Sequence, residues 1–219
     1  FNVSVDYYNI DIDDVITTIG AQDIVTRCAA GNQDMCSRIT RDSANTITRI
    51  VSTYVNLSNY KTDGVDVEMS YSMDASRVHS SLDGRLRLRT VGTWVNNLTT
   101  NDGVSEIDYV RSQGYSFGLG VPEFRVVSSL DYSGPVFGAN LRARYISPGN
   151  YNNTVDLVNG HIKAYTYVDL GVRAKLPEFN GYNVELYANA TNLFDKEPPI
   201  GSLYSPYYDV IGRYVTLGA

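Results

Sequence analysis

The chain has 219 residues, of which 43% are hydrophobic and 19% charged, and its formal net charge is −6 at pH 7. A net acidic chain disfavours DNA or RNA as a partner, because phosphate binding needs a basic face. The sequence has no run of about 18 apolar residues, which excludes a transmembrane helix. It also lacks the basic and then apolar start of a signal peptide. Because a strand pattern begins at Phe1, we expect the chain to be a fragment of a longer protein.

Alternation of apolar and polar residues predicts strands along most of the chain. The first strand runs from Phe1 to about Asp13. A long insert follows over Asp14–Asn45, with a helix expected at Ala21–Ala29. Thr46–Met73 is one long extended segment, in which Gly64 fits a bulge or a bend. Further strands are predicted at residues 85–94, 124–132, 137–145, 165–175 and 183–191, with a last strand from Tyr207.

The predicted connections alternate in length along about eight strands. Long connections span roughly residues 14–46, 97–115, 147–163 and 195–207, and short ones lie near residues 75–84, 133–135 and 177–181. Long loops alternating with short turns are typical of outer-membrane barrels. Predicted strands of about 10 residues or more also suit a tilted membrane strand better than an ordinary soluble one.

Tyrosine is unusually frequent, with 18 Tyr against 6 Phe and 1 Trp. Tyrosine suits places where one end of the ring is apolar and the other is wet, such as the aromatic girdles of membrane barrels. A tyrosine-rich soluble β-protein is the alternative. Cys28 and Cys36 lie in a polar stretch without the further ligands of a zinc site. A local disulfide in an oxidising compartment is the favoured interpretation, and two free thiols are the alternative.

Each predicted strand has one apolar and one charged face, but alternation alone does not decide which face points outward. Arg85, Arg87 and Arg89 share a face, while the preceding strand places Asp66 and Glu68 on its polar face. Ion pairs across strands in a polar lumen explain both sets better than a phosphate site does. The charges expected to face the lumen are Asp66, Glu68, Arg85, Arg87, Arg89, Arg142, Arg144, Asp169 and Arg173.

The C-terminal part carries an ordered set of motifs. It reads NLFDK from Asn192 to Lys196, then has two prolines, the pair Tyr207-Tyr208, and IGRY ending at Tyr214. This set resembles the C-terminal hairpin of TonB-dependent outer-membrane receptors. The GVDVE run and the paired-cysteine insert after DYYNI resemble two further patterns of that family. The residues that carry the family motifs are Gly64, Asp66, Glu68, Asn192, Leu193, Phe194, Asp195, Gly212 and Arg213.

The resemblance implies an all-β fold, an antiparallel transmembrane β-barrel. The chain would supply about eight C-terminal strands of a barrel of about 22. Residues 1–219 would then be a partial barrel domain without the plug domain, the TonB box and the signal peptide. The implied setting is the outer membrane of a Gram-negative bacterium. The implied partners are membrane lipid, the plug and remaining strands, the TonB complex and an extracellular small molecule.

The implied function is energised uptake of a scarce ligand of the siderophore-iron, carbohydrate or cobalamin class. The sequence shows no catalytic constellation and no glycine-rich phosphate loop, so we expect neither an enzyme nor a cofactor. A calcium ion held by Asp11, Asp13 and Asp14 is a minor alternative to a solvated acidic rim. A passive porin-like barrel and a soluble carbohydrate-binding β-sandwich are the alternative functions.

Overall fold

The structure is a computed structural model that describes residues 1–101, 105–114, 120–178, 181–200 and 205–219. The chain divides into two compact units. The first, which we call the wall unit, comprises residues 1–9, 62–98 and 108–219. The second, which we call the insert unit, comprises residues 10–61 and 99–107.

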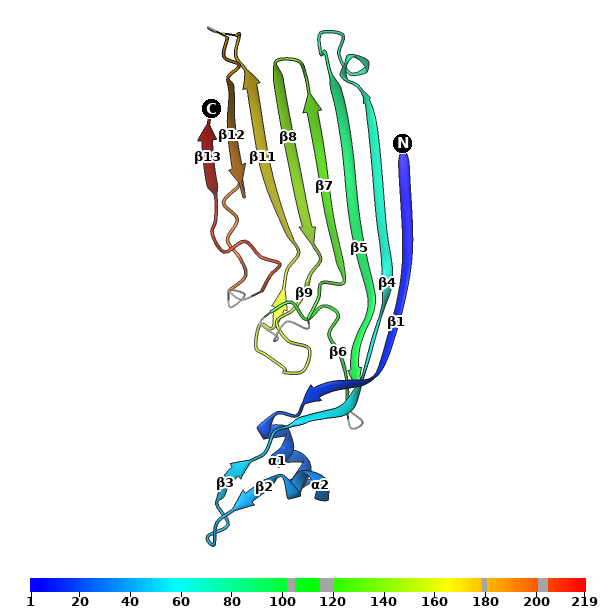
Figure 1. Cartoon of the computed structure of the whole chain (residues 1–219), viewed down its shortest axis with the longest axis vertical. Coiled ribbons are helices and arrows are strands. Elements are labelled where there is room, and N and C mark those ends of the chain that lie inside the picture. Colours follow the sequence, from blue (N-terminus) through cyan, green and yellow to red (C-terminus); the bar gives the residue numbers. More distant parts are fainter. Residues whose placement is uncertain (102–104, 115–119, 179–180, 201–204) are drawn as a thin grey trace. The chain divides into compact units, whose positions relative to one another are not determined.

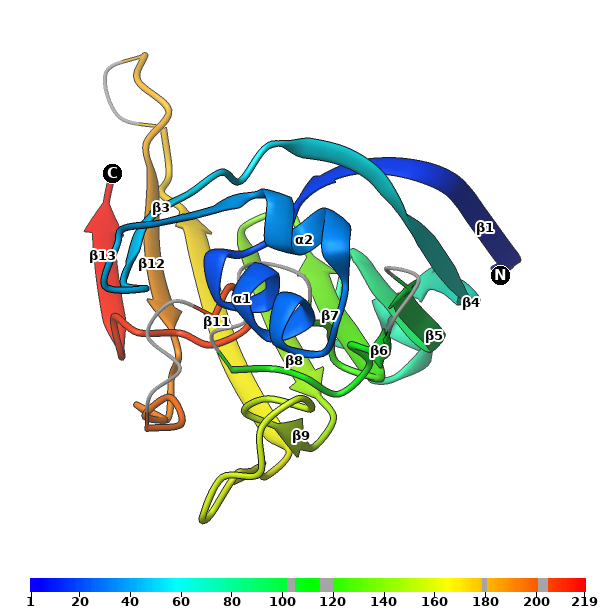
Figure 2. The same cartoon turned by 90° about the horizontal axis from the view of Figure 1, so that it is seen from below.

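One antiparallel sheet contains most of the strands, and their order in the sheet is their order in the chain (Figure 1). The order runs from β1 to β13 with no pairing between these two strands, so the sheet of the described residues is open. The sheet is curved when it is seen along its strands (Figure 2). Its strands are β1 (Asn2–Thr18), β4 (Tyr54–Asp74), β5 (Arg85–Asn101), β7 (Phe124–Ser133), β8 (Phe137–Ile146), β11 (Tyr165–Lys175), β12 (Glu185–Thr191) and β13 (Tyr214–Gly218), with β6 (Glu106–Asp108) paired to β5.

Register aligns the alternating residues of neighbouring strands into two faces. Leu130 lies opposite both Leu88 and Leu141, and Leu170 lies opposite Leu141, so one row crosses four strands. On the other face, Arg142 lies opposite both Ser129 and Asp169. Each strand therefore contributes its apolar residues to one face and its charged residues to the other, as the period-two pattern predicted.

The apolar face has an aromatic row at each end. Trp94 pairs with Phe124, whose ring centroid lies 6.3 Å from that of Tyr145. Toward the other end of the same strands, the rings of Tyr132 and Phe137 lie 6.4 Å apart. The eight steps along the strand from Phe124 to Tyr132 span about 27 Å at about 3.4 Å per residue. That length is close to the apolar band of about 25 Å on outer-membrane barrels.

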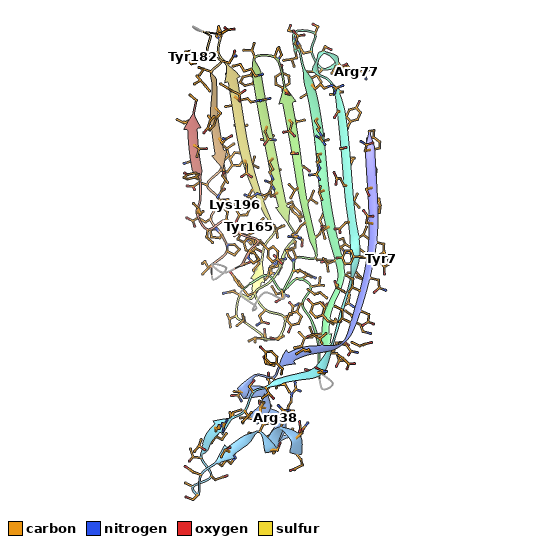
Figure 3. The ribbon with its side chains drawn as sticks, viewed as in Figure 1. Tyr7, Arg38, Arg77, Tyr165, Tyr182 and Lys196 are labelled. Atoms are coloured by element: carbon orange, nitrogen blue, oxygen red, sulfur yellow. A yellow bond between two sulfur atoms is a disulfide. The ribbon has the colours of Figure 1, made fainter. Side chains whose placement is uncertain are left out.

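The connections of the wall unit differ in length between the two ends of the sheet. Residues 75–84, 134–136 and the described residues between β11 and β12 form the turns at one end, and η1 (Ala75–Arg77) lies in the first of them. Figure 3 shows Arg77 and Tyr182 at this end, and Tyr165 and Lys196 toward the other. The longer segments, which include β9 (Gly149–Asn150) and β10 (His161–Ile162), lie at that other end.

Parts of three predicted connections lie outside the described residues. These are residues 102–104 and 115 of the expected loop 97–115, residues 179–180 of the turn at 177–181, and residues 201–204 of the loop at 195–207.

Several predicted strand boundaries were wrong. The last strand begins at Tyr214 and not at Tyr207, because Tyr208 is buried in a loop cluster and Gly212 adopts a positive φ of 80°. The first strand continues to Thr18, and β5 continues to Asn101 into the region expected to be a loop. The segment 46–73 is not one strand, since residues 51–53 interrupt it between β3 (Ile47–Ile50) and β4.

The insert unit contains the predicted helix α1 (Ala21–Ala29), followed by α2 (Gln33–Ser37) and a hairpin of β2 (Ile39–Arg41) with β3. In α1, Ile24 and Cys28 are four residues apart and therefore lie on one helix face. Ile24 packs with Ile19 and Met35 in a small core. The structure joins Cys28 and Cys36 in a disulfide beside that core. The serine hydroxyl of Ser52 donates a 2.7 Å hydrogen bond to the carbonyl of Ile19.

In the described residues, buried apolar side chains form packed clusters in two places. One is the small core of the insert unit, and the other is a tyrosine-rich cluster among the loops of the wall unit. The middle of the apolar sheet face stays open, since Leu88, Leu130 and Leu141 remain 37%, 43% and 44% exposed. The helices of the described residues are too short or too polar to cross a membrane.

Removing the disulfide by a Cys28→Ser/Cys36→Ser double change should destabilise the insert unit by about 2.5 kcal/mol, because the cross-link closes a short loop of sequence separation 8. Limited proteolysis with peptide mapping should show faster cleavage within residues 19–53 only. A reducing agent should reproduce the effect in the unaltered chain and add nothing to the variant. Equal cleavage rates in all samples would contradict this expectation.

Candidate functional site: the charged sheet face and its loops

The charged face of the sheet carries the residues expected to face a lumen. Within the register rows, Arg87 lies opposite Asp131, and Arg142 lies opposite Asp169. The guanidinium of Arg89 lies 2.8 Å from the carboxylate of Glu68, which brings β4 and β5 together through the charges that the sequence placed on their polar faces. These rows connect Arg85, Arg87, Arg89, Arg142, Arg144, Asp169 and Arg173 on one face, and the alternation of β4 adds Asp66 beside Glu68.

Most ion pairs on this face are well hydrated. The Arg89–Glu68 pair is about half exposed on both sides, and Arg173 lies 3.5 Å from Glu185 with about 40% of each side chain exposed. Exposed pairs of this kind contribute at most about 1 kcal/mol each. They keep the face polar and fix its register more than they stabilise the fold.

Arg144 lies at the centre of a less exposed cluster. Its guanidinium lies 3.3 Å from the carboxylate of Asp169 and 3.9 Å from that of Asp209. The same guanidinium lies 5.3 Å above the centre of the Tyr167 ring, a cation–π geometry. Asp169 also accepts a 3.0 Å hydrogen bond from the backbone N–H of Asn192. One cation thus connects β8 and β11 with both ends of the loop between β12 and β13.

Asn192 begins that loop and accounts for the first part of the NLFDK motif. Its buried side chain accepts a 2.9 Å hydrogen bond from the backbone N–H of Lys196 and donates a 3.0 Å bond to the Lys196 carbonyl. Its φ of 50° lies in the left-handed region, where asparagine is tolerated better than most residues. Leu193 donates a 2.7 Å backbone bond to Val168, which fastens the turn to β11. The side chain of Phe194 is 72% exposed.

Asp195, Gly212 and Arg213 account for the second part of the motif. The carboxylate of Asp195 accepts a 2.8 Å hydrogen bond from the backbone N–H of Arg213, which joins the start of the loop to its end. Gly212 has a φ of 80°, and a Cβ at this position would lie 3.1 Å from the same carboxylate. The side chains of Asn192 and Asp195 thus bind backbone groups of Lys196 and Arg213, and these motif residues form a clasp that holds the loop.

The clasped loop packs on a cluster of tyrosines at the charged face. Tyr208 packs edge-on against Tyr165, with ring centroids 5.2 Å apart, and its hydroxyl donates to the buried side chain of Gln113. The Tyr207 hydroxyl donates a 2.9 Å bond to the Gly120 carbonyl, and Arg125 lies above the Tyr207 ring. Burial raises the pKa of both Tyr207 and Tyr208 above the ordinary value, so both hydroxyls stay protonated donors in alkaline solution.

Gly64 of β4 leaves room for an aromatic side chain from the neighbouring strand β1. A Cβ at this position would clash with the ring of Tyr8 from β1 and with the backbone carbonyl of Trp94. The glycine of the GVDVE run therefore allows a close approach between neighbouring strands.

The structure brings together residues that sequence analysis did not single out. Arg125 and Asp131 followed from the polar alternation of β7 but were not chosen. Gln113 and Asp209 lie in loops, where no periodic signal identifies them; only the structure shows that they meet Tyr208 and Arg144.

A curved antiparallel meander with one apolar and one charged face is the architecture of transmembrane β-barrel walls. The sequence matches the family described as TonB dependent receptor-like, beta-barrel, over residues 1–193. The chain therefore belongs to the TonB-dependent receptor β-barrel family, which confirms the resemblance seen in its motifs. This is a family of receptors and transporters of the Gram-negative outer membrane, not of enzymes. No curated protein matches the chain.

The Arg144 cluster should contribute more to the free energy of unfolding than an exposed ion pair does. An Arg144→Met change leaves the Asp169 carboxylate unpaired with only 19% of its side chain exposed, and should cost about 2 kcal/mol of unfolding free energy. Arg173→Met, at the more exposed pair, is the control and should cost less than about 1 kcal/mol. Denaturant unfolding in detergent measures both. Adding Asp169→Asn to Arg144→Met should recover part of the loss, and equal costs for the two arginines would contradict the assignment.

Two Gly→Ala changes can separate the effect on stability of the close approach between Gly212 and Asp195 from the effect of the positive φ that glycine tolerates. Gly212→Ala and Gly181→Ala both introduce a Cβ at a φ near 80°, which costs about 1–2 kcal/mol. Of these two glycines, only Gly212 would place the added Cβ within 4 Å of a neighbouring side chain. Thermal unfolding should therefore show the larger loss for Gly212→Ala, and hydrogen exchange should rise in the described residues of 192–213. Equal losses would argue against the clasp.

Proposed function

We propose that this chain forms part of the wall and external loops of an energised importer in the outer membrane. In this proposal residues 1–219 are a partial barrel domain, and the remaining strands and a plug domain come from outside it. The TonB complex drives import through the plug, and the cargo is a scarce ligand of the siderophore-iron, carbohydrate or cobalamin class.

The two faces of the sheet are the observation that carries this proposal. A leucine row between two aromatic rows is left uncovered on one face, and about a dozen charged side chains share the other. A soluble β-sandwich would cover the leucine row with a second large sheet. The other sheets of the described residues are two-stranded. Lipid against the apolar face and a wet lumen against the charged face satisfy both sets of residues.

The open edges of the sheet support a larger barrel. β1 and β13 end the strand order and leave backbone donors and acceptors without a strand partner in the described sheet. In hydrocarbon each unpaired backbone group costs several kcal/mol, so a membrane sheet must close. The size of the family barrel, about 22 strands, leaves room for that closure.

Uptake in the bacterium that carries this receptor tests the transport proposal. Disrupting the receptor gene should abolish uptake of its ligand, and so should disrupting the TonB gene alone. A passive porin-like barrel predicts instead that uptake persists without TonB. The measurement is accumulation of labelled iron chelates, oligosaccharides and cobalamin at limiting concentration.

The orientation of the faces can be tested with two adjacent residues of β8. Spin labels at Leu141→Cys and Arg142→Cys sit on opposite faces of one strand, so each is the control for the other. In the whole receptor in lipid vesicles, the label at 141 should collide with dissolved oxygen and the label at 142 with a water-soluble nickel complex. The reverse pattern, or equal access for both labels, would overturn the proposed orientation.

A further inference from the structure

We propose that a hollow among the loops of the wall unit binds a neutral, hydroxyl-rich ligand of the carbohydrate class. This inference rests on the proposed function and narrows its three ligand classes to one. The hollow has a volume of about 650 Å³, in the range of pockets that hold small-molecule ligands. Its walls come from the segment before β7 and the segment between β8 and β11, and its polar side chains are Asp108, Arg111, Asn150, Asn152, Asn153, Asp156 and His161.

The frame of the hollow is held by hydrogen bonds of its own. The side-chain amide of Asn153 donates to the carbonyls of Asp108 and Val110, at 3.1 and 2.7 Å, and accepts from the amide of Asn150. The backbone N–H of Asn150 donates 2.7 Å to the Arg111 carbonyl, so the two segments are also joined directly. A site held in this way loses little conformational freedom on binding, which favours affinity for a small polar ligand.

The asparagines hold the frame, whereas the side chains of Asp156 and His161 are exposed and can contact a ligand. Asp156 and His161 are both exposed and project from the segment that the asparagines fix. A carboxylate accepts hydrogen bonds and an imidazole both donates and accepts, so together they can serve the hydroxyl groups of one sugar ring. The apolar residues Val110, Val155 and Leu157 line the same hollow and offer contact to the C–H groups of such a ring.

Charge argues against one of the ligand classes, the anionic iron chelates. The hollow contains the carboxylates of Asp108 and Asp156 against the single guanidinium of Arg111. That guanidinium lies 3.7 Å from the carboxylate of Glu123, which offsets its charge. A net negative hollow repels anionic iron chelates and leaves a neutral ligand free of that penalty.

A second hollow of about 520 Å³ adjoins the first, and the two share Asn152, Leu157 and Gly160. Tyr151 lines it, and an aromatic face is a suitable platform for a further sugar ring. The two hollows together favour a ligand of several units over a monosaccharide.

The test uses the whole receptor purified in detergent and an array of neutral and anionic glycans, followed by calorimetric titration with the neutral oligosaccharide that binds best. We expect binding to a neutral glycan. Asp156→Ala and His161→Ala should each weaken it about 10-fold, the loss of about one hydrogen bond. Glu178→Ala and His79→Ala remove the same kinds of side chain at the short-turn end of the sheet and should leave the affinity unchanged.

Three results would overturn the inference: no binding to neutral glycans, binding to anionic glycans only, or binding that neither loop variant weakens. Failure of this inference differs from failure of the transport proposal. A receptor that binds no neutral glycan but takes up an iron chelate in a TonB-dependent way is still an importer with another cargo. A receptor that binds the glycan but accumulates it without TonB has the site and lacks the energised function.

Discussion

The contact between Arg144 and Asp169 is the interaction on which the arrangement of the charged face and its loops depends. It joins two neighbouring strands through side chains that are mostly shielded from water, where a charge pair resists screening better than at the surface. The backbone of Asn192 and the carboxylate of Asp209 then bind to the same two charges. The two ends of the long loop after β12 are consequently anchored to the sheet.

A membrane barrel has no continuous apolar core, and this chain follows that rule. Its apolar side chains share one face of the sheet, and in the described residues packed clusters of buried apolar side chains form around Tyr167 and Tyr208 and around Ile24 and Met35. Stability therefore comes from ladder hydrogen bonds across the sheet and from these two small cores. Changes at the small cores should act locally, because each core is confined to its own unit.

Much of the sheet could be predicted from the sequence because strand residues alternate with a period of two, and the motifs identified the family. The limits of β7, β8 and β11 agree with the alternation within a residue. The last strand was placed too early because Tyr207 and Tyr208 look like strand residues, whereas contacts with Gln113 and Tyr165 hold them in a loop. The clasp between Asp195 and Arg213 and the hollow beside His161 depend on contacts between distant segments. A local pattern contains no record of such contacts.

Residues 19–53, which lie between β1 and β4 and which we call the insert module, have their two ends joined by the hydrogen bond between Ser52 and Ile19, and β1 and β4 are neighbours in the sheet. A polypeptide whose ends meet can be exchanged for another of different length without moving the strands that carry it. Recombination among related genes can therefore replace this module as a cassette. Receptors with the same wall can thereby acquire a different insert in a single exchange.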